Sequence, residues 1–540
     1  MKKYIIILLP IFIITLTGCI ERTPVIDTIY PRIGILGENL TIQGRNFGRE
    51  QNESFITIAG AQPTLSSYLS WENNQIVLII PEFAEPGLIY VHRGGRRSNP
   101  ALFANRATMP ERISGDELFN EPRVNSIEPG ISSVGSIITI LGNNFGSSRE
   151  NSSVWFSWDA ETAPSAPLAL QSREFVEVFD IELGYELWSE REIRVRVPDG
   201  AVSGYVEVRT SRGNSRPVFL EIGNAPGSKI LRNKRSYTFS YTVDIRVEHA
   251  SLPNTLYLWF PQPASSASQR NTELLTRNIE PYVENYRGTS LFQFTDLQPL
   301  STRRITLSYV VDVYQVHTNI RPQSITQNLN TPIHTIHTMP TPLIPSDHQD
   351  VRSRSTAIVG RETNPYNKAR LIYNWLLANA NINTEALSGG VLEALEEQTA
   401  DNYRASLLFC ALARAANVPA IPVTGVLIDR NRNTTRHYWA EFWIDSFGWI
   451  PVDPSLGAGA APLDFALPED YSAFYFGSSD NQRIEFSRGE IILSQMDPRG
   501  RISGRTREYA MQNLWEEAVG GLESYSSLWG DVTITGMYAQ

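Results

Sequence analysis

The chain has 540 residues, which is too many for a single hydrophobic core and therefore predicts several domains. Its composition, 41% hydrophobic and 19% charged, is that of an ordinary soluble protein. Its formal net charge of −10 gives no indication of nucleic-acid binding, which needs clustered Lys and Arg. The 36 Gly, the 33 Pro and the many aromatic residues favour β-rich modules with tight turns.

The first residues, "MKKYIIILLPIFIITLTGC", have the pattern of an export signal. Lys2 and Lys3 form a positive segment, and residues 5–16 form an apolar run that is too short to span a bilayer comfortably. A signal peptide over residues 1–18 is therefore favoured over an anchor helix. The final "LTGC" resembles a bacterial lipobox, and this resemblance implies that Cys19 becomes the mature N-terminus and carries lipid.

Lipid at Cys19 implies a partner and a location. Three acyl chains exceed the two signals that stable anchoring needs, so we expect the chain to be held on a lipid membrane of the cell envelope. Ile20 rather than Asp follows the cysteine, which resembles outer-membrane sorting in Gram-negative lipoproteins, on the periplasmic face or the cell surface. The alternative is an ordinary signal peptide with a chance cysteine. Once Cys19 is lipidated, Cys410 has no partner for an intramolecular disulfide.

One segment occurs twice, as "PVIDTIYPRIGILGENLTIQGRNFG" from Pro24 and as "PRVNSIEPGISSVGSIITILGNNFG" from Pro122. Alternating apolar residues indicate half-buried strands, and the "GRNFG" and "GNNFG" turns supply Asn and Gly where φ can be positive. A duplicated unit of this size is a small β-sandwich. The pair resembles the immunoglobulin-like IPT/TIG domains over residues 24–104 and 122–222, which in that family are spacers or binding surfaces. A longer loop or hairpin is expected for the insertion in the second copy.

A third β module is predicted over residues 232–320, where "YTFSYTVDIRV", "TLYLWFPQP" and "ITLSYVVDVYQV" are period-2 or fully apolar runs. The following Pro- and Thr-rich stretch, residues 321–350, is expected to be an extended connector. Its histidines, His334, His337 and His348, lack the Cys or carboxylate partners of a metal site, so solvated loop histidines are expected.

A helical part begins at "NPYNKARLIYNWLLANA". Asn364 is placed to cap the first helix and Pro365 suits its first turn. A short helix, "VLEALEEQ", and a long helix through Cys410 follow. The apolar residues of the first helix recur on one face, which predicts that this face packs against a core.

"ASLLFCALARAANVPAIPVTG" and "HYWAEFWIDSFGWIPVDPS" then resemble the transglutaminase-like family, with its papain-like α+β core. We assign residues 350–490 to this domain and residues 491–540 to a C-terminal extension. In the family a cysteine at a helix N-terminus is the nucleophile, because the helix dipole lowers the pKa of its thiol. A histidine acts as base and then acid, and an aspartate fixes its tautomer.

Carried over residue by residue, the resemblance implies that His437 and Asp453 are the histidine and aspartate of the triad. Counting back by the usual family gap from Arg414 places the nucleophile at Asn402, after Asp401. "DN" therefore stands where "DC" is expected, and the catalytic cysteine is missing.

Two points remain open in the sequence. Cys410 lies eight residues beyond Asn402 on the same helix, about 12 Å along its axis, and is expected to be a small buried hydrophobe rather than a displaced nucleophile. If Ile444 pairs with Trp449, His437 lies about 10 Å from the aspartate. A turn centred on Asp445 places the two residues opposite each other, and we adopt this register because the family's gap matches.

The predicted fold class is multidomain: tandem all-β immunoglobulin-like sandwiches, a further β module and an α+β transglutaminase-like (papain-like) domain. The favoured function is a lipid-anchored envelope protein whose inactive transglutaminase-like domain binds a peptide, a glycan or a protein, or acts as a scaffold. One alternative is an active cysteine protease or acyltransferase, and another is a structural spacer without a ligand. No phosphate loop, paired-carboxylate motif or metal-spaced cluster occurs, so no cofactor is expected.

Overall fold

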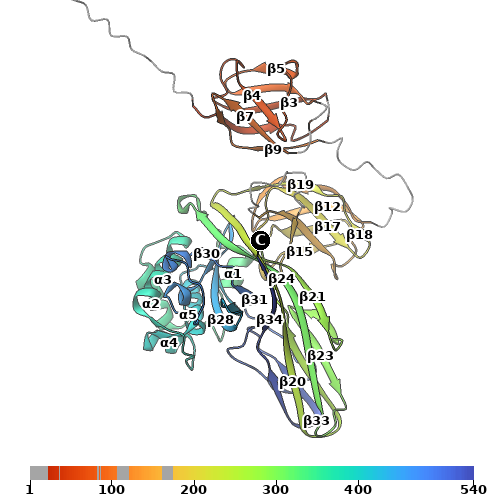
Figure 1. Ribbon diagram of the computed structural model, residues 1–540, viewed down its shortest axis with the longest axis vertical. Helices are drawn as coiled ribbons and strands as arrows, with labels where there is room; N and C mark the ends of the chain where they lie inside the picture. The colour runs from red at the N-terminus through yellow and green to blue at the C-terminus, as the bar shows by residue number, and fades with distance from the viewer. Residues whose placement is uncertain are drawn as a thin grey trace, which may run out of the picture. The chain divides into compact units, whose positions relative to one another are not determined.

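The computed structural model describes residues 22–35, 37–81, 84, 87–105, 121–160 and 174–539 (Figure 1). The chain divides into two compact units, one of residues 1–118 with 167–170 and the other of residues 119–166 with 171–540. Within the described ranges, no helix is long and apolar enough to cross a membrane. The predicted signal peptide and Cys19 lie outside the described residues.

The first unit holds a β-sandwich. Its strands are β1 (Val25–Tyr30), β2 (Ile33–Gly34), β3 (Asn39–Arg45), β4 (Phe55–Ile58), β5 (Tyr68–Trp71), β6 (Gln75–Ile79), β7 (Gly87–Arg93), β8 (Arg96–Arg97) and β9 (Ala101–Asn105). One sheet has the order β1-β3-β6-β5 and the other β2-β9-β7-β4, with β8 paired to β7. Alternate residues such as Leu40, Ile42 and Ile89 are buried between the sheets, as the period of two predicts.

The second unit begins with a sandwich of the same design. Its strands are β10 (Arg123–Glu128), β11 (Ile131–Ser133), β12 (Ile137–Asn143), β13 (Ser153–Trp158), β14 (Glu174–Glu177), β15 (Tyr185–Trp188), β16 (Glu192–Arg196), β17 (Gly204–Thr210), β18 (Gly213–Asn214) and β19 (Val218–Gly223). The pairs Ile29–Ile42 and Ile127–Ile140 hold equivalent registers in the two copies. Asn46 and Asn144 adopt φ of 64° and 63°, as the two turn motifs predict.

A large sheet follows, made of β20 (Gly227–Pro261), β21 (Gln269–Arg277), β22 (Val283–Tyr286), β23 (Thr289–Thr295), β24 (Thr302–Ile320), β30 (Ser478–Ser479), β32 (Arg501–Ser503), β33 (Glu516–Trp529) and β34 (Thr533–Ala539). The long strands β20 and β24 run side by side (Figure 1). Both β33 and β34 pair with β20, so the C-terminal extension completes the sheet of the third β module. The sequence did not predict this pairing.

The transglutaminase-like region combines helices with a sheet of order β29-β28-β27-β31. Its elements are α1 (Pro332–Thr338), α2 (Gln349–Val359), α3 (Pro365–Asn379), β25 (Asn381–Ile382), α4 (Val391–Glu397), β26 (Thr399–Ala400), α5 (Asn402–Ala415), β27 (Ala420–Ile428), β28 (Thr434–Ile444), β29 (Gly448–Val452), α6 (Pro454–Gly457), α7 (Tyr471–Phe474) and β31 (Arg483–Arg488). The helix α5 packs on β27 and β28, while α2, α3 and α4 surround it. Asn364 caps α3 as predicted.

The expectation of an extended connector over residues 321–350 is wrong. Thr331 caps the helix α1, whose first residue is Pro332, so this Pro-rich segment has a local reason to form a helix. The histidines of α1, His334 and His337, are buried rather than solvated. His337 donates from Nε2 to the carbonyl of Ile181 at 2.8 Å, and burial lowers the pKa of its imidazole to about 4.

The fold class predicted from the sequence is confirmed: N-terminal β-sandwiches precede a C-terminal domain in which helices pack on a sheet. Contacts within the second unit join its sandwich to that domain. The ammonium of Lys229 on β20 lies 2.5 Å from the carboxylate of Asp199 and donates to the carbonyl of Trp449 at 2.7 Å. The transglutaminase-like region is therefore built against its neighbours rather than tethered to them.

Candidate functional site

The candidate site begins at the N-terminus of α5. Asp401 is the N-cap, and its carboxylate accepts hydrogen bonds from the backbone N–H groups of Arg404 and Leu387, both at 2.9 Å. Arg507, from the C-terminal segment, also bonds to this carboxylate. Asn402 follows as the first residue of the helix, the position at which a helix dipole acts most strongly on a side chain.

The other half of the site comes from the β28–β29 hairpin. Ile444 pairs with Gly448, so both registers considered from the sequence are wrong. The physical reason is the turn. Ser446 adopts a φ of 63°, so the two strands are joined by a three-residue loop, and this loop length sets the register. In the observed register Asp453 lies one residue beyond the end of β29, and its carboxylate reaches His437 diagonally rather than from a directly opposed position.

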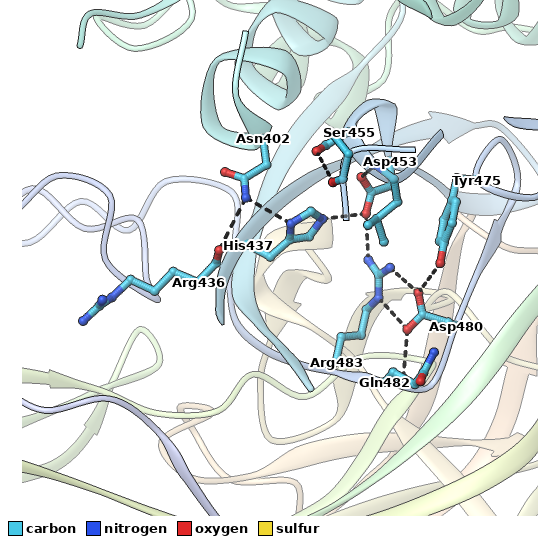
Figure 2. Close-up of polar contacts among 11 residues, drawn as sticks. Asn402, Arg436, His437, Asp453, Ser455, Tyr475, Asp480, Gln482 and Arg483 are labelled. Atoms are coloured by element: carbon cyan, nitrogen blue, oxygen red, sulfur yellow. Dashed lines mark hydrogen bonds and ion pairs between the residues drawn. The ribbon is translucent and has the colours of Figure 1, made fainter. Parts of the chain in front are cut away.

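His437 and Asp453 form a buried hydrogen-bonded pair. Nε2 of the imidazole lies 2.8 Å from Oδ2 of the carboxylate (Figure 2). Burial alone would raise the pKa of Asp453, but the neighbouring His437 and the guanidinium of Arg483 outweigh it and hold that pKa below its usual value. Oδ1 accepts from the backbone N–H of Leu456, which fixes the carboxylate as the N-cap of α6.

Asn402 occupies the remaining side of the imidazole. Its Nδ2 lies 3.2 Å from Nδ1 of His437 and 3.4 Å from the carbonyl oxygen of Arg436 (Figure 2). An amide that donates to Nδ1 leaves the proton of a neutral imidazole on Nε2, where it is donated to Asp453. The structure thus brings together Asn402, His437 and Asp453, three residues that lie far apart in the sequence.

A second row of polar residues supports the aspartate. Arg483 lies 3.3 Å from Oδ2 of Asp453 and 2.5 Å from Oδ2 of Asp480, which also accepts from the hydroxyl of Tyr475 at 3.0 Å (Figure 2). The guanidinium stacks on Trp439, with its carbon 4.7 Å from the ring centroid. Sequence reasoning missed this row, although "DNQR" places Asp480 and Arg483 three residues apart.

The imidazole and the aspartate of the site are buried, whereas Asn402 is only half-buried. The imidazole of His437 belongs to a residue that is 1% exposed. The C-terminal segment lies over the start of β28, where Arg436 forms ion pairs with Glu508 at 2.8 Å and with Asp531 at 3.0 Å. The hydroxyl of Tyr438 also donates to the carbonyl of Glu508. The histidine is therefore covered, while the position of Asn402 beside it stays partly exposed.

Cys410 is not at the site. Its side chain is fully buried in the helical core, among residues such as Phe409 and Phe442. Burial raises the pKa of its thiol to about 12, which leaves essentially no thiolate near neutral pH. The predicted lipid-bearing residue Cys19 lies outside the described part of the chain.

No metal site accompanies the polar cluster. Among the described residues, no three or more His, Cys, Asp or Glu side chains are grouped so that they could hold a metal ion. His348, the third connector histidine, is exposed and caps α2, where its Nδ1 accepts from the backbone N–H of Asp350.

Comparison with known proteins identifies the domains. The transglutaminase-like superfamily matches residues 352–454, and the IPT/TIG domain matches residues 24–104 and 122–160. The chain therefore carries IPT/TIG domains followed by a transglutaminase-like domain. The matched core ends just after Asp453, so it contains all three residues of the candidate triad.

Individual relatives are distant. An uncharacterised protein of Haemophilus influenzae is 30% identical over 122 residues, which is 18% of this chain and 33% of that protein, so the match spans about a third of the relative. A candidate cysteine protease from Cytophaga hutchinsonii covers 58% of this chain and 92% of its own at 17% identity, with a TM-score of 0.37. A surface glycan-binding protein from Prevotella bryantii covers 54% and 92% at 10% identity, with a TM-score of 0.14.

Proposed function

We propose that this chain is a lipid-anchored cell-envelope protein whose transglutaminase-like domain is catalytically inactive and acts as a binding or scaffolding module. The observation that carries the proposal is the amide of Asn402. It lies within hydrogen-bond distance of His437, on the side of the imidazole opposite Asp453, where the family resemblance places a thiol.

The side chain of Asn402 does not support covalent catalysis. An amide nitrogen conjugated to a carbonyl is neither ionised nor nucleophilic near neutral pH, so an acyl group has no atom to which it can be transferred. Removing the nucleophile from a comparable triad costs on the order of a million-fold in rate. Cys410 offers no replacement, because its thiol is buried in the middle of α5 and its pKa is raised.

The hydrogen-bonded chain through the site supports a scaffolding role. It links the N-terminus of α5, the strand β28, the start of α6 and the strand β31 through Asn402, His437, Asp453 and Arg483. Buried polar groups that are fully paired hold a fold in one arrangement. A peptide, glycan or protein ligand would then be recognised on the surface around the buried imidazole rather than by the imidazole itself.

The N-terminal features supply the proposed location. The "LTGC" motif at Cys19 supports lipid attachment, and Ile20 after it supports the outer membrane. The IPT/TIG domains lie between Cys19 and the transglutaminase-like domain in the sequence. These features are independent of the candidate site, so each part of the proposal has its own test.

Catalytic inactivity is tested with three proteins: the natural chain, Cys410→Ala, and Asn402→Cys in the Cys410→Ala background. Each is assayed on glutamine- and peptide-type substrates and treated with a thiol-reactive probe. We expect no turnover by the natural chain, and faster labelling of the Asn402→Cys variant at low pH than of a free thiol, because the helix terminus and His437 favour its thiolate.

Two outcomes would contradict inactivity. Turnover by the natural chain that disappears in Cys410→Ala would make Cys410 the nucleophile. Turnover that survives this change would place the chemistry on residues that the proposal does not include.

Lipid attachment is tested by labelling with palmitate in a bacterial host that processes lipoproteins. The natural chain should incorporate label and remain in the membrane fraction, and Cys19→Ser should incorporate none. Incorporation that survives Cys19→Ser would refute attachment at this residue.

A further inference from the structure

The N-terminus of α5 binds a cationic side chain from a distant part of the chain. Arg507 donates from Nη1 to the carboxylate of Asp401, and its guanidinium carbon lies 4.4 Å from the centroid of the Tyr403 ring. The side chain of Asp401 is 4% exposed. A buried carboxylate beside the face of an aromatic ring is a pair of groups that suits a guanidinium. Asn402 lies between these two residues in the sequence, so the guanidinium is bound next to the candidate triad.

Arg507 belongs to a short segment, residues 504–508, which we call the strap. It follows β32 and leads into the buried Tyr509. The strap forms no helix or strand, and within the described chain none of its backbone N–H groups donates to another backbone group. Gly504 and Thr506 are exposed, and Arg507 adopts a φ of 63°, which is uncommon for a residue other than glycine. The strap is therefore held by its side chains rather than by backbone pairing.

The strap also contacts β28 on both sides of His437. The carboxylate of Glu508 lies 2.8 Å from the guanidinium of Arg436, the residue before the histidine. The carbonyl of Glu508 accepts from the hydroxyl of Tyr438, the residue after it, at 2.7 Å. The strap thus joins the start of α5 to the strand that carries the imidazole, and its displacement would uncover both.

The guanidinium of Arg507 is incompletely paired in this position. Its Nη2 is buried and has no hydrogen-bond partner among the described residues, which costs stability. Arg505, on the same strap, donates from both Nε and Nη2 to the carboxylate of Glu516, at 3.2 Å and 3.0 Å. A guanidinium that is not tied to the strap backbone is free to turn and use more of its five N–H donors. An arginine from another chain can therefore compete with Arg507 for this position.

We propose that the position held by Arg507 is a subsite for an arginine side chain of a peptide ligand, and that the strap is an internal occupant which such a peptide displaces. This inference rests on the proposed binding role of the domain and names the class of its ligand. Arginine suits the subsite better than lysine, because its planar guanidinium stacks on the ring of Tyr403 while it bonds the carboxylate of Asp401. A peptide is favoured over a glycan because the present occupant is itself a peptide segment, whose carbonyl at Glu508 accepts from Tyr438.

The test uses a peptide with the sequence of residues 503–507, Ser-Gly-Arg-Thr-Arg, labelled at its N-terminus and amidated at its C-terminus. Its binding to the full chain is measured by fluorescence anisotropy. The Arg507→Gln chain should bind it about 10-fold more tightly than the natural chain does, because the internal occupant is weakened. The same peptide with Arg507→Gln should bind that variant about 10–100-fold more weakly, because it lacks the charge-assisted hydrogen bond to Asp401.

The matched control is Arg505→Gln in the chain. It also removes the cation of a buried carboxylate, Glu516, from the same strap, but it leaves Arg507 in place. This variant should bind the peptide as the natural chain does.

A second measurement needs no variant of the chain and so remains decisive if Arg507→Gln unfolds. A glutamate-specific protease is added to the natural chain, and cleavage after Glu508 is followed by mass spectrometry. The labelled peptide contains no glutamate and is not cut. It should accelerate this cleavage by displacing the strap, whereas the peptide with Arg507→Gln should not.

Equal binding of the two peptides to the Arg507→Gln chain, or cleavage after Glu508 that neither peptide accelerates, would overturn the subsite and leave catalytic inactivity standing. Turnover by the natural chain would instead refute inactivity, whatever the peptides do.

Discussion

The two IPT/TIG copies share one internal design but differ in their surroundings. In each, a tyrosine hydroxyl accepts a backbone N–H from the facing sheet: Tyr68 from Ile56 at 3.0 Å and Tyr185 from Val154 at 2.8 Å. In each, an indole N–H donates to a phenylalanine carbonyl at 3.0 Å, from Trp71 to Phe47 and from Trp188 to Phe145. The residues between the two sheets therefore specify the sandwich.

The outer surfaces of the copies have diverged. Leu65, three residues before Tyr68, is 74% exposed, whereas Glu182, three residues before Tyr185, is fully buried. Glu182 lies in the second unit beside Asp199, whose backbone N–H it accepts at 3.0 Å. A duplicated fold can thus retain its core while one copy buries a polar side chain, here Glu182, at its outer surface. The comparison teaches that burial at this position is decided by neighbouring domains and not by the repeat.

The largest expected difference in stability is between the loss of a buried ion pair in the second unit and the loss of an exposed ion pair in the first. Lys229→Ala leaves Asp199, whose side chain is 4% exposed, without its cation, and should lower the free energy of unfolding of the second unit by about 3–5 kcal/mol. Arg45→Ala removes the exposed pair with Asp27 in the first unit and should cost less than about 1 kcal/mol. Calorimetry of the full chain, with one transition expected for each unit, checks both. Equal losses would contradict the comparison.

The buried glutamate should make the second unit sensitive to pH. Burial, reinforced by the carboxylate of Asp199, raises the pKa of Glu182 to about 8, against the opposing charges of Arg488 and Lys229. The unfolded chain ionises this group near pH 4.5, so its contribution to stability is present below that pH and is lost as the pH rises towards about 8.

Glu182→Gln should therefore become more stable relative to the natural chain between about pH 4.5 and pH 8, by a few kcal/mol. Gln retains an oxygen that accepts the Asp199 N–H. Thermal unfolding of both proteins across this pH range measures the difference, and Leu65→Gln in the first copy is the control, with no pH dependence expected. A constant difference between the Glu182 variant and the natural chain would contradict the assignment.

A smaller, symmetric effect is expected at two equivalent glycines. A Cβ added at Gly44 would lie 2.0 Å from the carbonyl oxygen of Val25, and one added at Gly142 would lie 2.0 Å from that of Arg123. Each Gly→Ala change should cost about 1–3 kcal/mol through forced backbone shifts. The difference should appear in which calorimetric transition moves: the first unit for Gly44→Ala and the second for Gly142→Ala. Movement of both transitions by one variant would show that the units unfold together.

The smallest effect is expected where the copies agree. Tyr68→Phe and Tyr185→Phe each remove the acceptor of one backbone N–H between the sheets and should each cost about 1 kcal/mol. Urea unfolding of the two variants checks this. If the two losses of unfolding free energy differ by more than about 1 kcal/mol, the equivalent hydrogen bonds contribute unequally to stability although their geometry is the same.

Local sequence patterns predicted much of this structure. The strands of both sandwiches follow from alternating apolar residues, and the cap at Asn364 follows from its position before Pro365, because such signals depend on neighbours in the chain. The hairpin register could not be derived in this way. It depends on the turn at Ser446, whose positive φ places Asp453 one residue past its strand. The ion pair between Asp453 and Arg483 joins residues 30 positions apart, and no local sequence pattern predicted it.

By itself, the sequence determined that Asn402 stands where a thiol is expected and that the chain duplicates a β-sandwich, because both are statements about residue identity and spacing. Only the tertiary structure decided that His437 is closed off from solvent, that His337 is buried, and that the C-terminal strands β33 and β34 pair with β20. Burial and strand pairing at long range depend on which surfaces meet in the folded chain. The free energy of those contacts is set by side chains that are distant in sequence, so no local pattern specifies it.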